Sequence, residues 1–113
     1  MGRSTRKNAL KDRMRVILNG KRWFIWFVRS REIPADRYGD CGYSGSTPII
    51  RVRRALQGKM ALNVLIHEVL HASRPELAEE AVTETANDIE KVLWRRGYRL
   101  THERKESSRK SPD

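Results

Sequence analysis

The sequence has a single cysteine, Cys41, and no apolar run long enough to cross a membrane. A lone cysteine excludes a disulfide within the chain and fits a reducing compartment. The longest apolar run, Trp23 to Val28, ends after six residues, whereas a transmembrane helix needs about 20. The first residues also lack the apolar core of a secretory signal. We therefore expect a cytoplasmic protein without a membrane partner.

The charge of the chain is unevenly distributed. The sequence has 113 residues and a formal net charge of +10, which fits one small domain with a marginal core. Residues 1–22 carry eight basic side chains and one acidic one, and residues 95–113 carry seven basic and three acidic ones. Residues 23–94 carry nine basic and ten acidic side chains. The ends are therefore basic (+7 and +4), while the middle is nearly neutral at −1. Basic ends allow non-specific nucleic-acid binding, but no base-reading motif is present.

The composition also predicts where the folded part lies. Residues 1–12 are polar and basic without an apolar period, which predicts a flexible arm. Residues 101–113 are charged and rich in serine, which predicts a disordered tail. One domain is expected between them, over residues 13–100.

The first half of this domain has the pattern of a small sheet. Apolar segments on both sides of Asn19-Gly20 predict an antiparallel hairpin, because this pair suits a type I′ turn. Residues 31–48 are rich in turn-forming residues and predict a long loop. Residues 49–54 predict a short edge strand with Ile50 and Val52 facing inward and Arg51 and Arg53 outward.

The second half predicts two helices. Apolar residues cover almost all sides of a helix that follows Gly58 and runs to about Ala72, so we expect it to be buried. Ser73-Arg74-Pro75-Glu76 has the spacing of a capping box and predicts that a second helix starts there and ends before Gly97. The expected fold class is α+β, with a small antiparallel or mixed sheet packed on the first helix and a second long helix beside it.

The sequence His67-Glu68-Val69-Leu70-His71 lies within the first predicted helix. Residues four apart share one helix face, so the two imidazoles can reach one metal ion while Glu68 lies beside them. This HExxH spacing is typical of a Zn²⁺ site in which the glutamate acts as general base. The motif predicts Zn²⁺ as the cofactor and Glu68 as the catalytic residue.

A catalytic zinc ion usually has three protein ligands and one open position. His67 and His71 supply two, and the only other histidine, His102, is in the predicted tail. The third ligand is therefore expected to be a carboxylate of the second helix. The acidic residues in reach by sequence are Glu79, Glu80 and Glu84. On a helical wheel Glu80 lies nearly opposite the apolar face, while Glu79 and Glu84 lie nearer its edges.

Two stretches carry a resemblance to known families. Glu80-Ala81-Val82-Thr83-Glu84 resembles the Glu-Ala-x-x-Asp of thermolysin-like gluzincins, which implies that Glu80 binds zinc and Glu84 orients a ligand histidine or serves as an alternative ligand. The stretch from Ile49 to Gly97 resembles small zinc metallopeptidase-like proteins of bacteriophages and prophages, and covers about half of the chain. This resemblance implies a minimal zincin-like fold and a phage-encoded protein acting in the bacterial cytoplasm.

These features together predict a zinc-dependent metallopeptidase that hydrolyses a protein or peptide substrate. A substrate paired with the edge strand of residues 49–54 would lie over the zinc. Tyr43, Tyr98 and Arg99 are candidates for stabilising the oxyanion, and Cys41 for an inhibitory fourth ligand. The alternative is a non-catalytic, metal-stabilised basic protein that binds nucleic acid or acts in virion assembly. The sequence does not specify the substrate or the oligomeric state.

Overall fold

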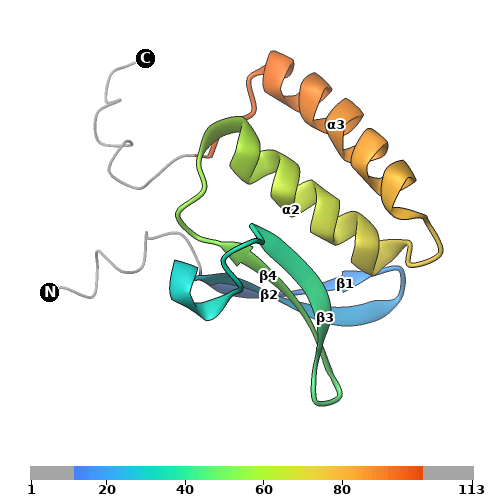
Figure 1. Ribbon diagram of the computed structural model, residues 1–113. Helices are drawn as coiled ribbons and strands as arrows, with labels where there is room; N and C mark the ends of the chain where they lie inside the picture. The colour runs from blue at the N-terminus through green and yellow to red at the C-terminus, as the bar shows by residue number, and fades with distance from the viewer. Residues whose placement is uncertain (1–11, 101–113) are drawn as a thin grey trace, which may run out of the picture.

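The computed structural model describes residues 12–100 and contains a four-stranded mixed sheet and two long helices (Figure 1). The predicted α+β class is confirmed. Except for Asp12, the predicted arm and tail lie outside the described residues. The elements, in chain order, are β1 (Arg13–Leu18), β2 (Lys21–Val28), the short 3₁₀ helix η1 (Ser30–Glu32), β3 (Gly39–Ser44), β4 (Thr47–Arg53), α2 (Gly58–Ser73) and α3 (Glu79–Arg96).

The predicted hairpin is present. β1 and β2 pair antiparallel, with Leu18 opposite Lys21. Asn19 and Gly20 have φ angles of 52° and 79°, as a type I′ turn requires. The amide of Asn19 also donates a hydrogen bond of 3.0 Å to the carbonyl of Ser73. The turn therefore contacts a carbonyl at the end of α2 that has no partner within the helix.

The predicted loop over residues 31–48 is wrong in part, because β3 lies within it. β3 contains two glycines, an aspartate and a serine, which are poor strand formers. It is held by antiparallel pairing with β4 and by the carboxylate of Asp40, which accepts hydrogen bonds of 2.9 and 2.5 Å from Arg51. These are tertiary interactions, and local sequence patterns do not reveal them.

The strand order is β1-β2-β4-β3, so the prediction that residues 49–54 form an edge strand is also wrong. β4 pairs parallel with β2 and antiparallel with β3. The inward positions were predicted correctly, since Ile50 and Val52 are almost fully buried. Arg53 points away from α2 and donates to the carbonyls of Arg37 and Pro34 at 2.8 and 2.9 Å. Its charge therefore anchors the segment between η1 and β3.

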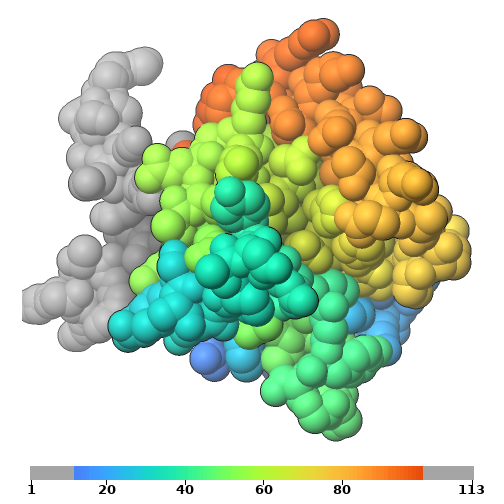
Figure 2. All heavy atoms as spheres, in the orientation of Figure 1, coloured from blue at the N-terminus to red at the C-terminus, as the bar shows by residue number. Residues whose placement is uncertain are grey.

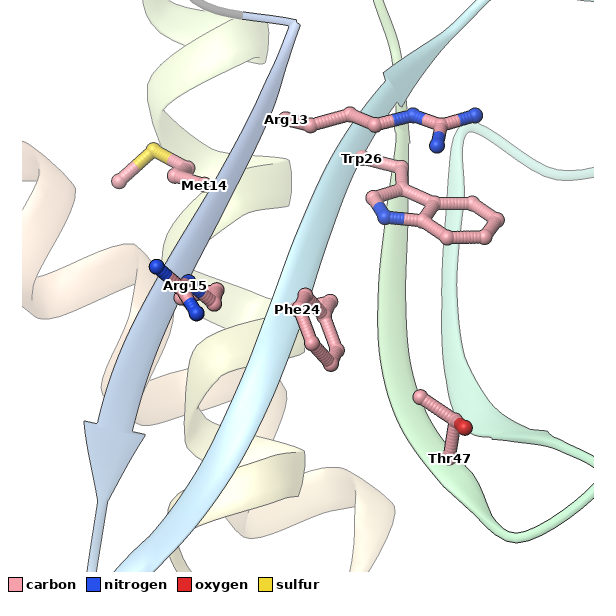
Figure 3. A pocket seen from close by; sticks show the side chains of 6 residues that line it. All are labelled: Arg13, Met14, Arg15, Phe24, Trp26 and Thr47. Carbon is pink, nitrogen blue, oxygen red and sulfur yellow. The ribbon is translucent and has the colours of Figure 1, made fainter.

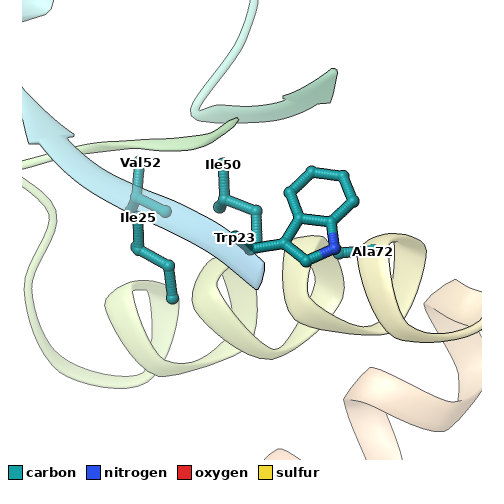
Figure 4. Close-up of a cluster of buried hydrophobic side chains, with 5 residues drawn as sticks. All are labelled: Trp23, Ile25, Ile50, Val52 and Ala72. Atoms are coloured by element: carbon teal, nitrogen blue, oxygen red, sulfur yellow. The ribbon is translucent and has the colours of Figure 1, made fainter. Parts of the chain in front are cut away.

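α2 packs across one face of the sheet and α3 packs on α2, which gives three layers (Figure 1). Figure 4 shows the core between sheet and helix, formed by Trp23, Ile25, Ile50, Val52 and Ala72. In α2 itself only Glu68 and Ala72 are buried. The helix is therefore less enclosed than its apolar sequence predicts, because the sheet and α3 leave one strip of it open.

The predicted start of the second helix at Ser73 is wrong. Ser73 is the last residue of α2, and the N–H of Arg74 donates to the carbonyl of Leu70 at 2.8 Å. Glu76 binds the side chain of Arg74 instead of closing a capping box. α3 begins at Glu79 and ends at Gly97, which has φ 105°. The turn at residues 74–78 thus places the first residue of α3 beside the end of α2.

We predict that Gly20→Ala lowers the free energy of unfolding by about 1–2 kcal/mol, because a left-handed backbone is unfavourable for alanine. A Cβ at this position would meet no atom within 4 Å, so the cost is conformational alone. Gly42→Ala is the matched control, since its Cβ would also lie in open space and its φ is not left-handed. Urea unfolding of both variants measures the difference, and equal losses would contradict the prediction.

Candidate metal centre

The second half of α2 brings the two histidines together as the spacing predicts. The Nε2 atoms of His67 and His71 lie 3.2 Å apart, and the two rings meet edge to face with centroids 4.8 Å apart. Their side chains are 20% and 28% exposed. Both imidazoles are therefore partly exposed to solvent.

Glu79, the first residue of α3, completes the group. One carboxylate oxygen lies 3.1 Å from Nε2 of His67, and the other lies 2.9 Å from Nε2 of His71. The two helices are joined farther along by Asn63, whose amide donates to the side chains of Asn87 at 2.9 Å and Glu90 at 3.4 Å. This link and the short turn at residues 74–78 fix Glu79 over the histidines.

The spacing of the two histidine nitrogens fits a tetrahedral ion. Ligand atoms about 2.05 Å from zinc are about 3.3 Å apart at tetrahedral angles. The two Nε2 atoms are 3.2 Å apart, close to that value, and each of them lies beside a different carboxylate oxygen of Glu79. Among the described residues, His67, His71 and Glu79 form the group of possible metal ligands, with ligand atoms all within 4.8 Å of one another. Three ligand atoms on one side would leave a fourth position open.

Glu79, and not Glu80, is therefore the glutamate that lies beside the two histidines. Glu80 and Glu84 are both exposed and are not members of the group. The difference follows from the start of α3. A helical wheel drawn from Ser73 assumes a regular helix through Glu79, whereas residues 74–78 form a turn. At a helix start, side-chain direction depends on that turn as well as on the helical period.

Glu68 lies on the neighbouring strip of α2 and faces β3. Its side chain is buried, and the residue is 8% exposed. Burial raises the pKa of its carboxyl to about 7, with further increases from the negative charges of Asp40 and Glu79 and an opposing effect of Arg37. A carboxyl in this position is poorly hydrated and close to two other acidic groups, which are properties common in catalytic sites.

Gly39 allows this close packing, and sequence reasoning missed it. A Cβ at residue 39 would lie 2.9 Å from Cγ1 of Val64, 3.0 Å from the carbonyl oxygen of Arg51 and 3.1 Å from Cγ of Glu68. Only a glycine lets β3 approach α2 at this point. The sequence does show a glycine at residue 39, but within a predicted loop it indicates only a turn. Its role in close packing becomes clear only once residues 39–44 are known to form a strand.

Cys41 does not join the metal group. Burial first, and then the charges of Glu68 and Asp40, raise the pKa of its thiol to about 11. Among the described residues, Cys41 is not a member of the group formed by His67, His71 and Glu79. The role of Cys41 as an inhibitory ligand gains no support from its position, and its side chain packs at the margin of the core.

The three oxyanion candidates lie at different places. Tyr43 is on β3, where its hydroxyl contacts the Lys21 ammonium group and its ring lies 6.0 Å from that of Trp23. Arg99 donates to the carbonyls of Trp94 and Tyr98 beyond the far end of α3. α3 has 18 residues and is therefore about 27 Å long. Tyr98 and Arg99 are thus remote from Glu79.

The sheet has two edge strands, β1 and β3, and β3 is the one that lies beside Glu68. The N–H of Arg53 donates to the carbonyl of Tyr38, and the register continues as Asp40 opposite Arg51 and Gly42 opposite Ile49. Because inward and outward peptide groups alternate in an antiparallel pair, those of Gly39, Cys41 and Tyr43 face the open edge. The edge is thus adjacent to Glu68 through Gly39. No described helix is long and apolar enough to cross a bilayer.

Comparisons of the chain with models of known protein families, with curated proteins and with solved structures found no match. The resemblance to phage-type zinc metallopeptidases therefore rests on the residues quoted for it, and the site is interpreted from its own geometry.

Proposed function

We propose that the protein is a zinc-dependent metallopeptidase in which His67, His71 and Glu79 bind Zn²⁺ and Glu68 is the general base. The observation that carries the proposal is the convergence of two imidazole nitrogens and a carboxylate from two helices, with a buried glutamate on the adjacent strip of α2. The proposal needs both the group of possible ligands and the buried glutamate, since exposed acidic groups often lie near histidines without a metal.

The types of ligand favour zinc over other divalent ions. Imidazole suits Zn²⁺ better than it suits Mg²⁺ or Ca²⁺, which prefer oxygen ligands. Two histidines and one glutamate are a ligand set of catalytic zinc sites, which keep a fourth position for water. The partial exposure of both histidines gives water and a substrate access to that position.

The chemistry divides between the ion and the chain. When bound at such a site, zinc lowers the pKa of a coordinated water to about 7 and polarises a carbonyl. Glu68 follows His67 directly in the helix, so its carboxylate can accept a proton at the ion and return it to the leaving amine. Burial of Glu68 keeps competing water away from its carboxylate.

The open edge of β3 supports a peptide as the substrate. An extended peptide can pair with the outward peptide groups of Gly39, Cys41 and Tyr43, as peptides do at other exposed sheet edges. Gly39 lets this edge approach Glu68 closely, because a side chain at residue 39 would collide with Val64 and Glu68. The predicted pairing with β4 is replaced by pairing with β3, because β4 already has a neighbour on each side.

The ligand assignment predicts one tightly bound zinc ion per chain and distinguishes two adjacent glutamates. Glu79→Gln should weaken zinc binding by about 100-fold or more. Loss of a residue that only orients a metal ligand weakens binding by about 10- to 100-fold, and loss of a ligand itself should cost at least as much. Glu80→Gln removes the same charge and should leave affinity unchanged. Competition with a chromophoric chelator measures both. The ligand assignment fails if Glu80→Gln weakens binding and Glu79→Gln does not.

The role of Glu68 is tested separately from metal binding. Glu68→Gln should bind zinc as the wild type does but hydrolyse a pool of fluorogenic peptides about 10²- to 10⁴-fold more slowly, which is the usual contribution of a general base. Glu84→Gln is the control with unchanged activity. Full activity of the zinc-loaded Glu68→Gln protein, or no zinc-dependent hydrolysis by the wild type, would contradict the proposal.

A further inference from the structure

The face of the sheet opposite α2 carries a second set of chemical groups. Alternation along β2 places Trp23 and Ile25 in the core and turns Phe24 and Trp26 to the other face. Their neighbours in register on β1 are Arg15 and Arg13. In Figure 3 the rings of Phe24 and Trp26 lie on β2 with these arginines beside them, while the helices pass behind the sheet.

This face is hollowed as well as aromatic. A hollow of about 920 Å³ lies on this face, lined by Arg13, Met14, Arg15, Phe24, Trp26 and Thr47. A second hollow adjoins it and is lined by Arg15, Val16, Ile17 and Arg22. The first hollow is open to solvent, so a planar base can approach the rings that line it.

The charge of the face is positive. Neither hollow is lined by an acidic residue, and among residues 12–100 no carboxylate forms an ion pair with Arg13, Arg15 or Arg22. Asp40, farther along the same face, is already bound by two nitrogens of Arg51. Positive charges without counter-charges beside an aromatic surface attract an anionic partner.

The aromatic groups are arranged for stacking. The guanidinium of Arg13 lies over the Trp26 ring, 4.3 Å from its centroid. Planar guanidinium and indole groups are both surfaces on which unpaired bases stack. Phe24 and Trp26 are two residues apart on one strand, hence about 6.8 Å apart. Because Arg13 covers one face of the Trp26 ring, one base can stack on this guanidinium and indole pair and a neighbouring base on Phe24.

Other occupants fit this face less well. A second copy of the chain would place one group of arginines against another. Residues 1–11 carry four basic and no acidic side chains, and residues 101–113 carry four basic and three acidic ones, so neither end has a net negative charge. Paired bases in a duplex are already stacked and cannot cover the rings.

We infer that this face binds single-stranded nucleic acid, with bases stacked on Trp26 and Phe24 and phosphates contacted by Arg13, Arg15 and Arg22. The surface lies on the other side of the sheet from Glu68 and the histidines, so the inference does not depend on the metallopeptidase proposal. It also differs from binding by the basic ends, because it places the contacts on the folded domain.

Titration of the full-length protein with a fluorescein-labelled oligothymidylate of about 16 nucleotides, a length that covers one small binding domain, tests the inference. Trp26→Ala should weaken binding by about 5- to 150-fold, the usual effect of losing one stacked base. Trp94→Ala is the matched control, because Trp94 also has an arginine over its ring, Arg99, but lies on α3. It should bind as the wild type does.

Two further variants guard against loss of folding. Trp26→Phe keeps an aromatic ring and should retain most of the affinity. Arg15→Ala should reduce the salt dependence, with the slope of log K against log salt falling by about 0.7 for the lost phosphate contact. Glu68→Gln should change neither the affinity for the oligonucleotide nor its salt dependence, which separates this surface from the metal site.

Three results would overturn the inference. Equal affinities of the wild type, Trp26→Ala and Arg15→Ala would show that the basic ends alone bind the oligonucleotide. Equal binding of a duplex of the same length would exclude base stacking. Binding to anionic vesicles or self-association that Trp26→Ala abolishes, without oligonucleotide binding by the wild type, would assign the surface to another partner.

Discussion

The packing of α2 across the sheet is the constraint on which the rest of the molecule depends. Ala72 contacts the same core as Trp23, Ile50 and Val52, and this contact fixes the rotation of α2 about its axis. Once the rotation is fixed, each strip of the helix has one neighbour. Glu68 faces β3, while His67 and His71 face the start of α3. Because protein cores are densely packed, a small rotation of α2 would disturb both of these contacts. The core and the candidate metal centre are therefore coupled through one helix. Figure 2 shows α2 between α3 and β3 at the surface, and Figure 4 shows the same helix beside the core.

The sequence alone predicts the parts of this arrangement that depend on short-range patterns. The Asn19-Gly20 turn, the helix with His67 and His71 on one face, and the end of α3 at Gly97 all follow from spacing or from backbone preference. The α+β class follows from the same segments. Each of these features involves residues only a few positions apart, so the neighbouring sequence contains the necessary information.

The missing parts depend on contacts between distant segments. β3 forms although its residues disfavour a strand, because pairing with β4 and the bonds between Asp40 and Arg51 hold it. Its presence moves β4 into the interior of the sheet and makes β3 an edge strand. Glu79 was one of three possible ligands, and the choice depended on a turn whose capping-box spacing suggested a helix. The meaning of Gly39 likewise depends on how closely β3 approaches α2.

The two faces of the sheet have different chemistry. α2 and α3 carry the imidazoles and the glutamates of the candidate metal centre on one side, while Arg13, Arg15 and Arg22 lie beside Phe24 and Trp26 on the other. These three arginines belong to the basic residues 1–22, so part of that basic charge lies on the folded sheet. The β2 sequence expresses the difference between the faces directly, since alternate aromatic residues enter the core or face away from it. Aromatic composition alone therefore does not distinguish core packing from a binding surface, whereas the strand register does.

The central claim is that two histidines and one glutamate hold a single zinc ion. X-ray absorption spectroscopy of the zinc-loaded protein tests it most directly, because the spectrum reports the types of ligand and their distances. The account predicts a first shell of nitrogen and oxygen at about 2.0–2.2 Å, including scattering from two imidazoles, and no sulfur. A sulfur scatterer at about 2.3 Å, which would place Cys41 on the metal, or a shell without imidazole would contradict it.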